Sequence, residues 1–129
     1  MGFQKLLAFQ KGYLLAMEIF EVSQRFPREE RYSLTDQIRK SSRSVCANIG
    51  EALRKRRYQK HFISKLTDAD AENSETQVWL HFSQDCGYIT LLETKELLKQ
   101  SMEVGKLIDF MIRDPEKFGS DQLPTATAN

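Results

Sequence analysis

The sequence predicts an all-α fold, an antiparallel up-down-up-down four-helix bundle built from residues 1–118. Four long segments repeat apolar residues at the three- and four-residue spacing of one helical face, and no segment alternates like a strand. Phe26-Pro27, Gly87 and Asp114-Pro115 punctuate these segments. A chain of 129 residues is long enough for one domain with a single core, which needs neither a disulfide nor a metal to fold.

The first helix is expected over about residues 3–25, because a residue before proline is pushed out of the α region at Phe26-Pro27. Its expected core face consists of Phe3, Leu6, Leu7, Leu14, Met17 and Phe20. Leu15, Ile19 and Val22 widen the apolar surface beyond one stripe. This breadth has two interpretations, a helix packed between two neighbours or a helix that also meets another subunit.

The second helix is expected over residues 34–57, where one face packs and a neighbouring face carries cations. Ser33 is expected to cap its first amides through the side chain, with Asp36 at the positive end of the helix dipole. The expected core stripe is Leu34, Ile38, Val45, Ile49 and Ala52. A second stripe carries Arg39, Arg43 and Arg54, and a break or kink is expected at residues 55–58.

The third helix is expected over about residues 58–85, ended by a glycine cap at Gly87. Its apolar set is Phe62, Leu66, Ala69, Trp79 and Leu80. Asn73 and Thr76 dilute this stripe in the middle of the segment.

Thr90-Leu91-Leu92-Glu93 is a capping box that opens the fourth helix, and Asp114-Pro115 closes it. The expected core stripe is Leu97, Leu98, Met102, Ile108 and Ile112. Leu107, Phe110 and Met111 broaden the last turns. Residues 119–129 have almost nothing to bury, so a disordered C-terminal tail is expected there.

The formal net charge of +1 hides an uneven distribution along the chain. Residues 39–65 hold nine bases and one acid, Glu51, for a charge of +8, whereas the other ten bases and 17 acids give −7. The candidate nucleic-acid-binding residues are Arg39, Lys40, Arg43, Arg54, Lys55, Arg56, Arg57 and Lys60. The plainer interpretation is a solvated helix end whose cations favour the C-terminus of the helix dipole.

No catalytic constellation is found, so we expect a non-enzymatic protein. His61 and His81 lack the Glu-x-x-His pattern of di-iron bundles, so no metal is expected. The six glycines are scattered and form no phosphate-cradling loop, so no cofactor is expected. The sequence shows no signal peptide and no membrane-spanning stretch. We therefore expect Cys46 and Cys86 to be buried, reduced thiols in a cytoplasmic protein with no membrane partner.

Four further residues are expected to act in structure or at an interface: Asn48, Glu51, Glu72 and Glu75. Asn48 is expected to make a buried hydrogen bond, because asparagine is poorly placed in the middle of a helix otherwise. The acids of residues 68–75 are expected to form a solvated face, screened by Lys65 at i, i+3 to Asp68. Glu72 and Glu75 are exceptions that face second-helix arginines, within one subunit or across a subunit boundary.

Residues 26–56 read FPREERYSLTDQIRKSSRSVCANIGEALRKR. This segment resembles the four-helix-bundle family encoded by open reading frames within intervening sequences of bacterial large-subunit ribosomal RNA genes. The positions that fit the family's pattern are Phe26-Pro27, Glu30, Leu34, Gln37-Ile38-Arg39, Ser44, Asn48-Ile49 and Glu51. The resemblance extends through Glu75-Thr76-Gln77 and Gly87-Tyr88-Ile89, whereas Ala52 replaces a usual glycine.

The resemblance implies a left-handed four-helix bundle, assembly into homopentamers and no established enzymatic activity. Similar relatives are the accessory proteins of diversity-generating retroelements, which form basic pentameric barrels that engage nucleic acid and a reverse transcriptase. Two functions therefore remain open. One is an oligomer that binds RNA or DNA, with structured RNA or an RNA–protein assembly expected. The other is a protein-interaction scaffold whose arginines pair with acids of a neighbouring subunit.

Overall fold

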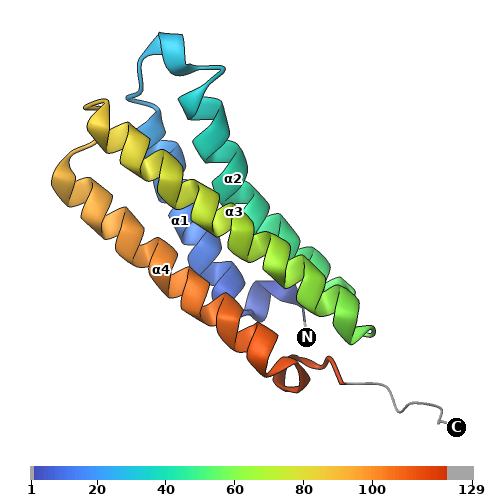
Figure 1. Ribbon diagram of the computed structural model, residues 1–129. Helices are drawn as coiled ribbons and strands as arrows, with labels where there is room; N and C mark the ends of the chain where they lie inside the picture. The colour runs from blue at the N-terminus through green and yellow to red at the C-terminus, as the bar shows by residue number, and fades with distance from the viewer. Residues whose placement is uncertain (1, 122–129) are drawn as a thin grey trace, which may run out of the picture.

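The computed structural model describes residues 2–121, which form four long helices and no strand (Figure 1). The helices are α1 (Leu7–Ser23), α2 (Leu34–Arg54), α3 (Gln59–Asp85) and α4 (Leu91–Arg113). Three short 3-10 helices flank them, η1 (Phe3–Lys5), η2 (Arg28–Glu30) and η3 (Pro115–Phe118). The predicted all-α class and its four helices are confirmed. Within residues 2–121 no helix is both long enough and apolar enough to span a membrane.

Each helix packs along two others, so that α1 contacts α2 and α4, and α3 also contacts α2 and α4 (Figure 1). At one end, the Tyr88 hydroxyl donates to Glu30 Oε2 over 2.8 Å. At the other end, Gln59 Nε2 donates to the Ser120 carbonyl over 2.9 Å. The core between the helices is a single cluster that includes Ile19, Ile38, Ile49, Phe62, Leu66, Leu80, Val104 and Ile108.

The predicted core face of the first helix is wrong for most of its residues, although Leu6 is buried as predicted. Leu7, Leu14 and Met17 are 51%, 61% and 45% exposed. The buried face consists of Ala8, Gly12, Leu15, Ala16, Ile19 and Ser23. Small residues face inward because α2 approaches closely, and a Cβ atom added at Gly12 would lie 3.4 Å from Cys46 Sγ. Leu15 and Ile19 are the large apolar residues of this buried face, whereas Leu7, Leu14 and Met17 lie on the outer surface of α1.

Polar residues complete the core faces of α3 and α4. Asn73 and Thr76 do not dilute the α3 stripe, since both are buried. Asn73 Nδ2 donates to the Ser101 carbonyl over 2.8 Å, and the Ser101 hydroxyl donates back to Asn73 Oδ1 over 2.9 Å. On α4, Leu97 and Ile108 are buried as predicted, but Met102 is 58% exposed and Met111 takes its place in the core. Leu98, Ile112 and Trp79 are partly buried against the core.

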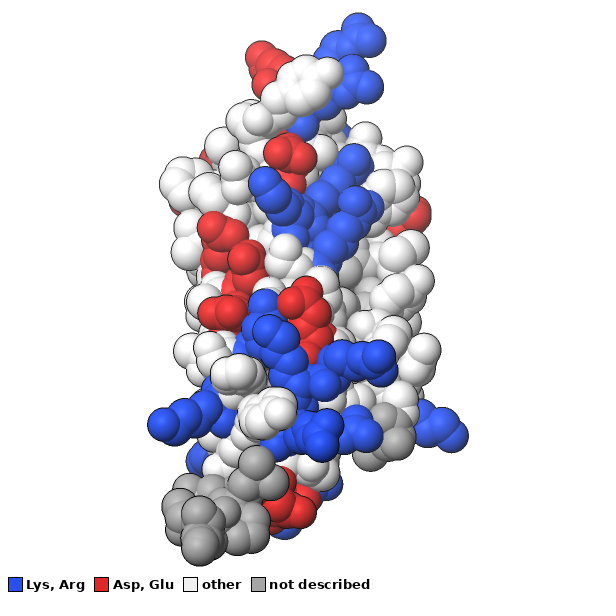
Figure 2. Space-filling view, turned by 90° about the vertical axis from the view of Figure 1, so that its right-hand side faces the viewer, with Lys and Arg blue, Asp and Glu red and all other residues white. Residues whose placement is uncertain are grey.

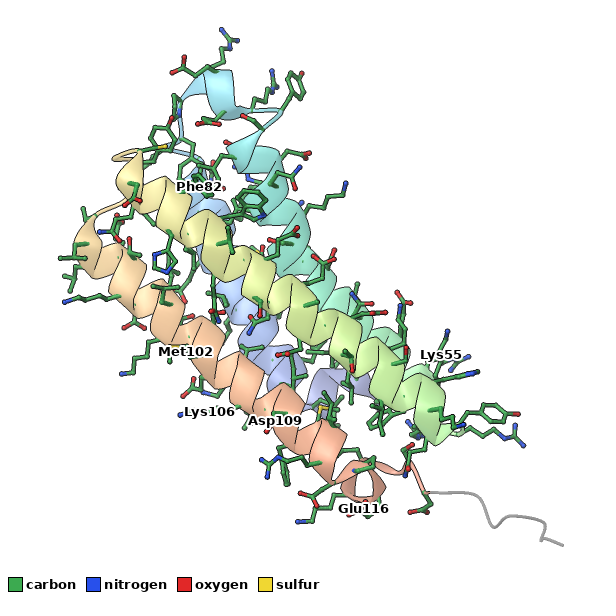
Figure 3. The ribbon with its side chains drawn as sticks, viewed as in Figure 1. Lys55, Phe82, Met102, Lys106, Asp109 and Glu116 are labelled. Atoms are coloured by element: carbon green, nitrogen blue, oxygen red, sulfur yellow. The ribbon has the colours of Figure 1, made fainter. Side chains whose placement is uncertain are left out.

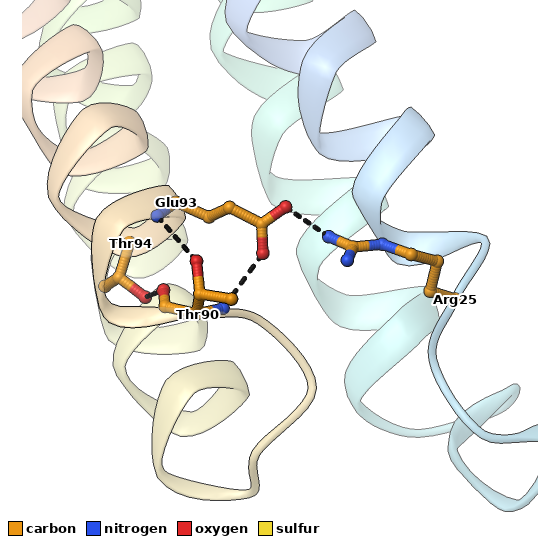
Figure 4. A network of polar contacts seen from close by, with 4 residues as sticks. All are labelled: Arg25, Thr90, Glu93 and Thr94. Atoms are coloured by element: carbon orange, nitrogen blue, oxygen red, sulfur yellow. Dashed lines mark hydrogen bonds and ion pairs between the residues drawn. The ribbon is translucent and has the colours of Figure 1, made fainter.

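The predicted ends of α3 and α4 are confirmed. Gly87 has φ +79°, and the amide of the next residue, Tyr88, donates to the Ser83 carbonyl over 2.9 Å. Thr90 and Glu93 form the capping box, in which the Glu93 amide donates to Thr90 Oγ1 over 3.0 Å and the Thr90 amide to Glu93 Oε1 over 2.9 Å (Figure 4). The backbone bond from Thr90 is the main reason that the pKa of Glu93 is lowered. The other carboxylate oxygen of Glu93 accepts from Arg25, just past the end of α1.

The start of α2 is capped by Glu30 and not by the Ser33 side chain. Ser33 donates its hydroxyl to Glu30 Oε1, which also accepts from the Leu34 amide over 3.2 Å. The reason is the Ser33 backbone, whose φ of −123° and ψ of −105° differ from the extended geometry of a capping serine. The pKa of Glu30 is lowered by its hydrogen bonds. The bond from the Ser33 hydroxyl has the largest effect, followed by that from the Tyr88 hydroxyl and then that from the Leu34 amide.

The chain stays packed against the bundle beyond residue 118. Ser120 is buried, and its amide donates to the Pro115 carbonyl over 3.1 Å. Residues 119 and 120, which the sequence assigns to the tail, therefore pack on the bundle, and residues 122–129 of the expected tail lie outside the described part of the chain.

The two cysteines have different surroundings, so the prediction of two buried thiols is wrong for Cys86. Cys46 is buried on α2, and burial raises the pKa of its thiol to about 11. Cys86 is exposed because it is the C-terminal cap of α3, beyond the last helical turn.

We predict that Glu30→Ala destabilises the protein by about 1 kcal/mol at pH 7, the usual size of a lost helix cap. The pKa of Glu30 is lowered in the folded state, so its stabilisation is present above the unfolded pKa and is lost as pH falls through the folded pKa. The difference in urea-unfolding free energy between the variant and the native chain should shrink in acid. Glu29→Ala, at the exposed neighbouring acid, is the control, and an equal loss in both variants would contradict the role of Glu30.

We also predict that the native protein exposes one fast-reacting thiol per chain. Thiolate is the reactive form, so the exposed Cys86 should react with an aromatic disulfide reagent well before the buried Cys46. Denatured, non-reduced protein should give two thiols. Two equally fast thiols in the native state would show that α1 and α2 separate readily around Cys46.

Candidate nucleic-acid interface

The predicted basic residues lie in two places, on the first half of α2 and where α2 passes into α3. Figure 2 views the bundle from the right-hand side of Figure 1 and shows an upper and a lower group of Lys and Arg side chains, with acidic side chains between and beside them. Arg43 and Arg54 are eleven positions apart on one helix, which corresponds to about 16 Å at 1.5 Å per residue. The continuous basic segment of the sequence is thus two separate clusters in space.

The pocket cluster consists of Arg31, Arg39, Lys40 and Arg43, which line one open pocket of about 490 Å³. Its other lining residues are Thr35, Asp36, Ser44 and Ala47. α1 holds two of these arginines in place. Arg39 Nε donates to Ser23 Oγ over 2.7 Å, and its guanidinium lies 4.7 Å from the centre of the Phe20 ring. The Arg43 guanidinium lies 5.6 Å from the same ring, at a distance where cation–π attraction operates.

The turn cluster consists of Arg54, Lys55, Arg57 and Lys60, all exposed where α2 passes into α3. This passage lies at the predicted break, and Figure 3 shows Lys55 at the end of the bundle away from Phe82. Exposed Tyr58 lies in the same turn, with its ring centre 5.7 Å from that of exposed His61. The turn therefore presents cations and two aromatic rings together.

Arg56 lies in the same turn but differs from the turn cluster. It is half-buried, and its Nη1 donates to the Leu53 carbonyl over 3.5 Å. Its Cδ would lie 3.3 Å from a Cβ atom added at Gly119, so its side chain packs on the C-terminal segment. Because of this packing, Arg56 is not a member of the turn cluster.

The predicted structural residues make contacts within one chain. Glu51 pairs with Lys65 over 3.1 Å, and Lys65 also lies 3.8 Å from Asp68, at the predicted i, i+3 spacing. Asn48 Nδ2 donates to the Ser44 carbonyl over 2.9 Å within α2, and Asn48 is half-buried where full burial was expected.

The acids of α3 face a lysine of α2. Glu72 is half-buried, and desolvation, followed by the charge of Glu75, raises its pKa, while the charge of Lys40 acts in the opposite direction. Within one chain, Glu72 therefore interacts with a lysine of the pocket cluster, where the sequence predicted an arginine. Glu75 is exposed beside it.

Among residues 2–121, the cations of both clusters have no ion-pair partner within 4.0 Å. The ion pairs within 4.0 Å among residues 2–121 involve Lys11, Arg25, Lys65 and Arg113. Neither the pocket cluster nor the turn cluster contributes to them. In the same part of the chain, no group of three or more His, Cys, Asp or Glu side chains is arranged to hold a metal ion. The surface is therefore suited to anions supplied by another molecule.

Two residues of the pocket, Arg31 and Thr35, are not among the residues predicted from the sequence. Arg31 belongs to a charged run that is typical of a solvated connection, and only the fold brings it beside Arg39. Thr35 lies on the buried side of the first turn of α2 and is 7% exposed. No local pattern marks a hydroxyl at that position, so the sequence offers no signal for it.

Comparison with known proteins identifies the family of this chain. The family model described as 23S rRNA-intervening sequence protein matches residues 4–109. The chain belongs to this family. A solved member of the S23 ribosomal protein family, a protein of unknown function from Bacteroides thetaiotaomicron, superposes with a TM-score of 0.74 at 29% identity. The match covers 82% of this chain and 98% of the Bacteroides chain. No functionally curated protein gave a significant match.

Membership of the 23S rRNA-intervening sequence protein family agrees with the resemblance that residues 26–56 indicate. The matched region includes all of α1, α2 and α3 and most of α4, and therefore both basic clusters.

Proposed function

We propose that this member of the 23S rRNA-intervening sequence protein family is a non-enzymatic, oligomeric protein that binds nucleic acid, with structured RNA or an RNA–protein assembly as the target. The observation that carries the proposal is the turn cluster, four exposed cations that none of the ion pairs in residues 2–121 uses. Neutralising phosphates with such cations releases counterions, which is the main source of sequence-independent affinity for nucleic acid.

The proposed contacts are to the phosphate backbone. Lysine and arginine side chains at a helix end position a protein on nucleic acid but read no bases by themselves. The exposed rings of Tyr58 and His61 lie beside these cations and offer faces on which unpaired bases stack. This combination favours unpaired or looped RNA with little preference for sequence.

The proposed assembly is a homopentamer of antiparallel up-down-up-down bundles. Its support is the apolar surface left outside the core of each chain. Exposed Tyr13 and Leu14 line an open hollow of about 620 Å³ with Phe3 and Phe9. On α4, Met102 lies on the outer side of the helix one turn before Lys106 (Figure 3). Exposed apolar surface of this extent is typical of subunit contacts.

The alternative is a protein-interaction scaffold without nucleic-acid binding. The observation in its favour is that Glu72 and Glu75 lie side by side on α3, where desolvation, followed by the charge of Glu75, raises the pKa of Glu72. In this alternative, arginines of one subunit pair with Glu72 and Glu75 of the next. Removal of the arginines lowers nucleic-acid affinity if the protein binds nucleic acid, and it disturbs assembly if the protein is a scaffold.

We predict a solution mass of about 75 kDa by light scattering, as expected for five chains of 15.0 kDa. Leu14→Glu should lower this mass, because a charge at an exposed apolar position disfavours contact between subunits without disturbing the core. Circular dichroism should show unchanged helix content. A monodisperse 15 kDa native protein at micromolar concentration would end the oligomer proposal.

We predict that the triple variant Arg54→Gln, Lys55→Gln, Arg57→Gln weakens RNA and DNA binding alike. For about five phosphates neutralised per site, log affinity should fall with log salt at a slope of roughly −4.5 on duplex, and the variant should flatten the slope to about −2. Arg56 is left in place because it packs on Gly119. Fluorescence anisotropy at several salt concentrations measures both quantities.

The matched control is Lys95→Gln, Lys99→Gln, Lys106→Gln, which removes the same charge from exposed positions of α4. It should leave most of the affinity, and the mass of each variant should be recorded on the same samples. Unchanged affinity of the turn variant with intact assembly would refute nucleic-acid binding through the turn cluster, and dissociated subunits would favour the scaffold.

A further inference from the structure

We propose that the pocket cluster forms a binding site for a phosphomonoester group, contacted by Arg31, Arg39 and the hydroxyl of Thr35. The proposal rests on the proposed function only for the source of the phosphate, since a terminal phosphate of a nucleic acid and free phosphate share this chemistry. The turn cluster does not line the pocket, so the two proposals fail separately.

The charge of the pocket fits a group with more than one negative charge. Arg31, Arg39, Lys40 and Arg43 face a single lining acid, Asp36, which leaves +3. Glu72 on α3 offsets part of the Lys40 charge. A phosphomonoester carries about −1.5 to −2 at pH 7, whereas an internal phosphodiester carries one negative charge. The surplus positive charge of the pocket therefore favours a phosphomonoester over an internal phosphodiester.

Thr35 supplies the observation that points to a ligand. Its hydroxyl is buried, and no group within residues 2–121 forms a hydrogen bond with it. Buried side-chain polar atoms almost always have a partner, and a hydroxyl hydrogen rotates to reach one. A phosphate oxygen in the pocket provides the acceptor that the fold does not.

Two adjoining hollows meet at these residues. The pocket of about 490 Å³ and a second one of about 230 Å³ are both lined by Arg31, Thr35 and Arg39. The second hollow is completed by residues at and beyond the end of α1, namely Ser23, Gln24, Phe26, Pro27 and Arg28. A group seated at the shared wall reaches both guanidinium groups and the hydroxyl.

Arg39 is already held in place before any ligand binds. Its Nε bond to Ser23 and its position over Phe20 fix the guanidinium, which leaves Nη1 and Nη2 as donors for a phosphate. Little side-chain entropy is then lost on binding, and preorganisation of this kind raises affinity.

The first experiment titrates the full chain with inorganic phosphate by calorimetry, at ionic strength held constant with chloride. We expect saturable binding of one phosphate per chain. Thr35→Val and Arg39→Gln should each weaken it by about tenfold, the effect of losing one hydrogen bond to a charged group. Lys99→Gln, an exposed position of α4 outside both clusters, is the matched control and should bind phosphate like the native chain.

Stability measurements separate binding from folding. Thr35→Val removes a hydroxyl that has no partner, so its melting temperature without phosphate should equal or exceed that of the native chain. Phosphate should raise the melting temperature of the native chain and of Lys99→Gln more than that of Thr35→Val. If Arg39→Gln unfolds, Arg31→Gln takes its place, because Arg31 is exposed and is the other proposed guanidinium contact. No saturable phosphate binding, or equal binding by the native chain and Thr35→Val, would overturn the site.

The second experiment compares one short RNA carrying a 5′-phosphate with the same RNA carrying a 5′-hydroxyl. Tighter binding of the phosphorylated RNA by the native chain, lost in Thr35→Val, supports the site with a nucleic-acid terminus as the source. Equal binding of both RNAs together with saturable phosphate binding supports the site with a free phosphate or small phosphate ester as the source. Phosphate binding without any RNA binding keeps the site and refutes the proposed function.

Discussion

The close approach of the helices through small and polar side chains is the constraint on which the rest of the structure depends. Gly12 of α1 leaves room for Cys46 of α2, and the Thr76 hydroxyl of α3 lies 2.9 Å from the Ser41 hydroxyl of α2. Asn73 and Ser101 join α3 to α4 by two reciprocal hydrogen bonds. Buried polar groups paired in this way are satisfied in the core, and they specify which helix faces meet.

This constraint also explains the outer surface of the bundle. The inner face of α1 includes four small residues, Ala8, Gly12, Ala16 and Ser23, and Leu7, Leu14 and Met17 are left outside. The same packing brings Phe20 of α1 against Arg39 and Arg43 of α2, so the core geometry orients the cations of the pocket cluster. Core packing and surface chemistry are thus parts of one arrangement.

Local signals in the sequence predict the helix ends well, whereas features set by tertiary contacts escape them. Gly87 and the Thr90–Glu93 capping box act within a few residues of themselves, so their sequence patterns are sufficient. The sequence favours Ser33 as the α2 cap, whereas Glu30 takes that role and its other oxygen accepts from Tyr88, 58 residues further on. The predicted core face of α1 is wrong because apolar size alone does not reveal the need for close approach.

The cations of the candidate site can be predicted as residues but not as surfaces. A run of basic residues in the sequence does not reveal that Arg43 and Arg54 are separated along α2, nor that Arg56 packs on Gly119. Arg31 joins the pocket from the connection between α1 and α2, which carries no regular period to read, and Thr35 joins it from the first turn of α2.

The carboxylate of Glu93 links the start of α4 to the segment that follows α1. One of its oxygens accepts from the Thr90 amide and so helps to start α4, while the other accepts from Arg25 beyond the end of α1. The first turn of α4 and the segment that follows α1 thereby share one carboxylate. Fraying of this turn of α4 also releases Arg25 from its ion pair, so the two segments are coupled at this corner of the bundle.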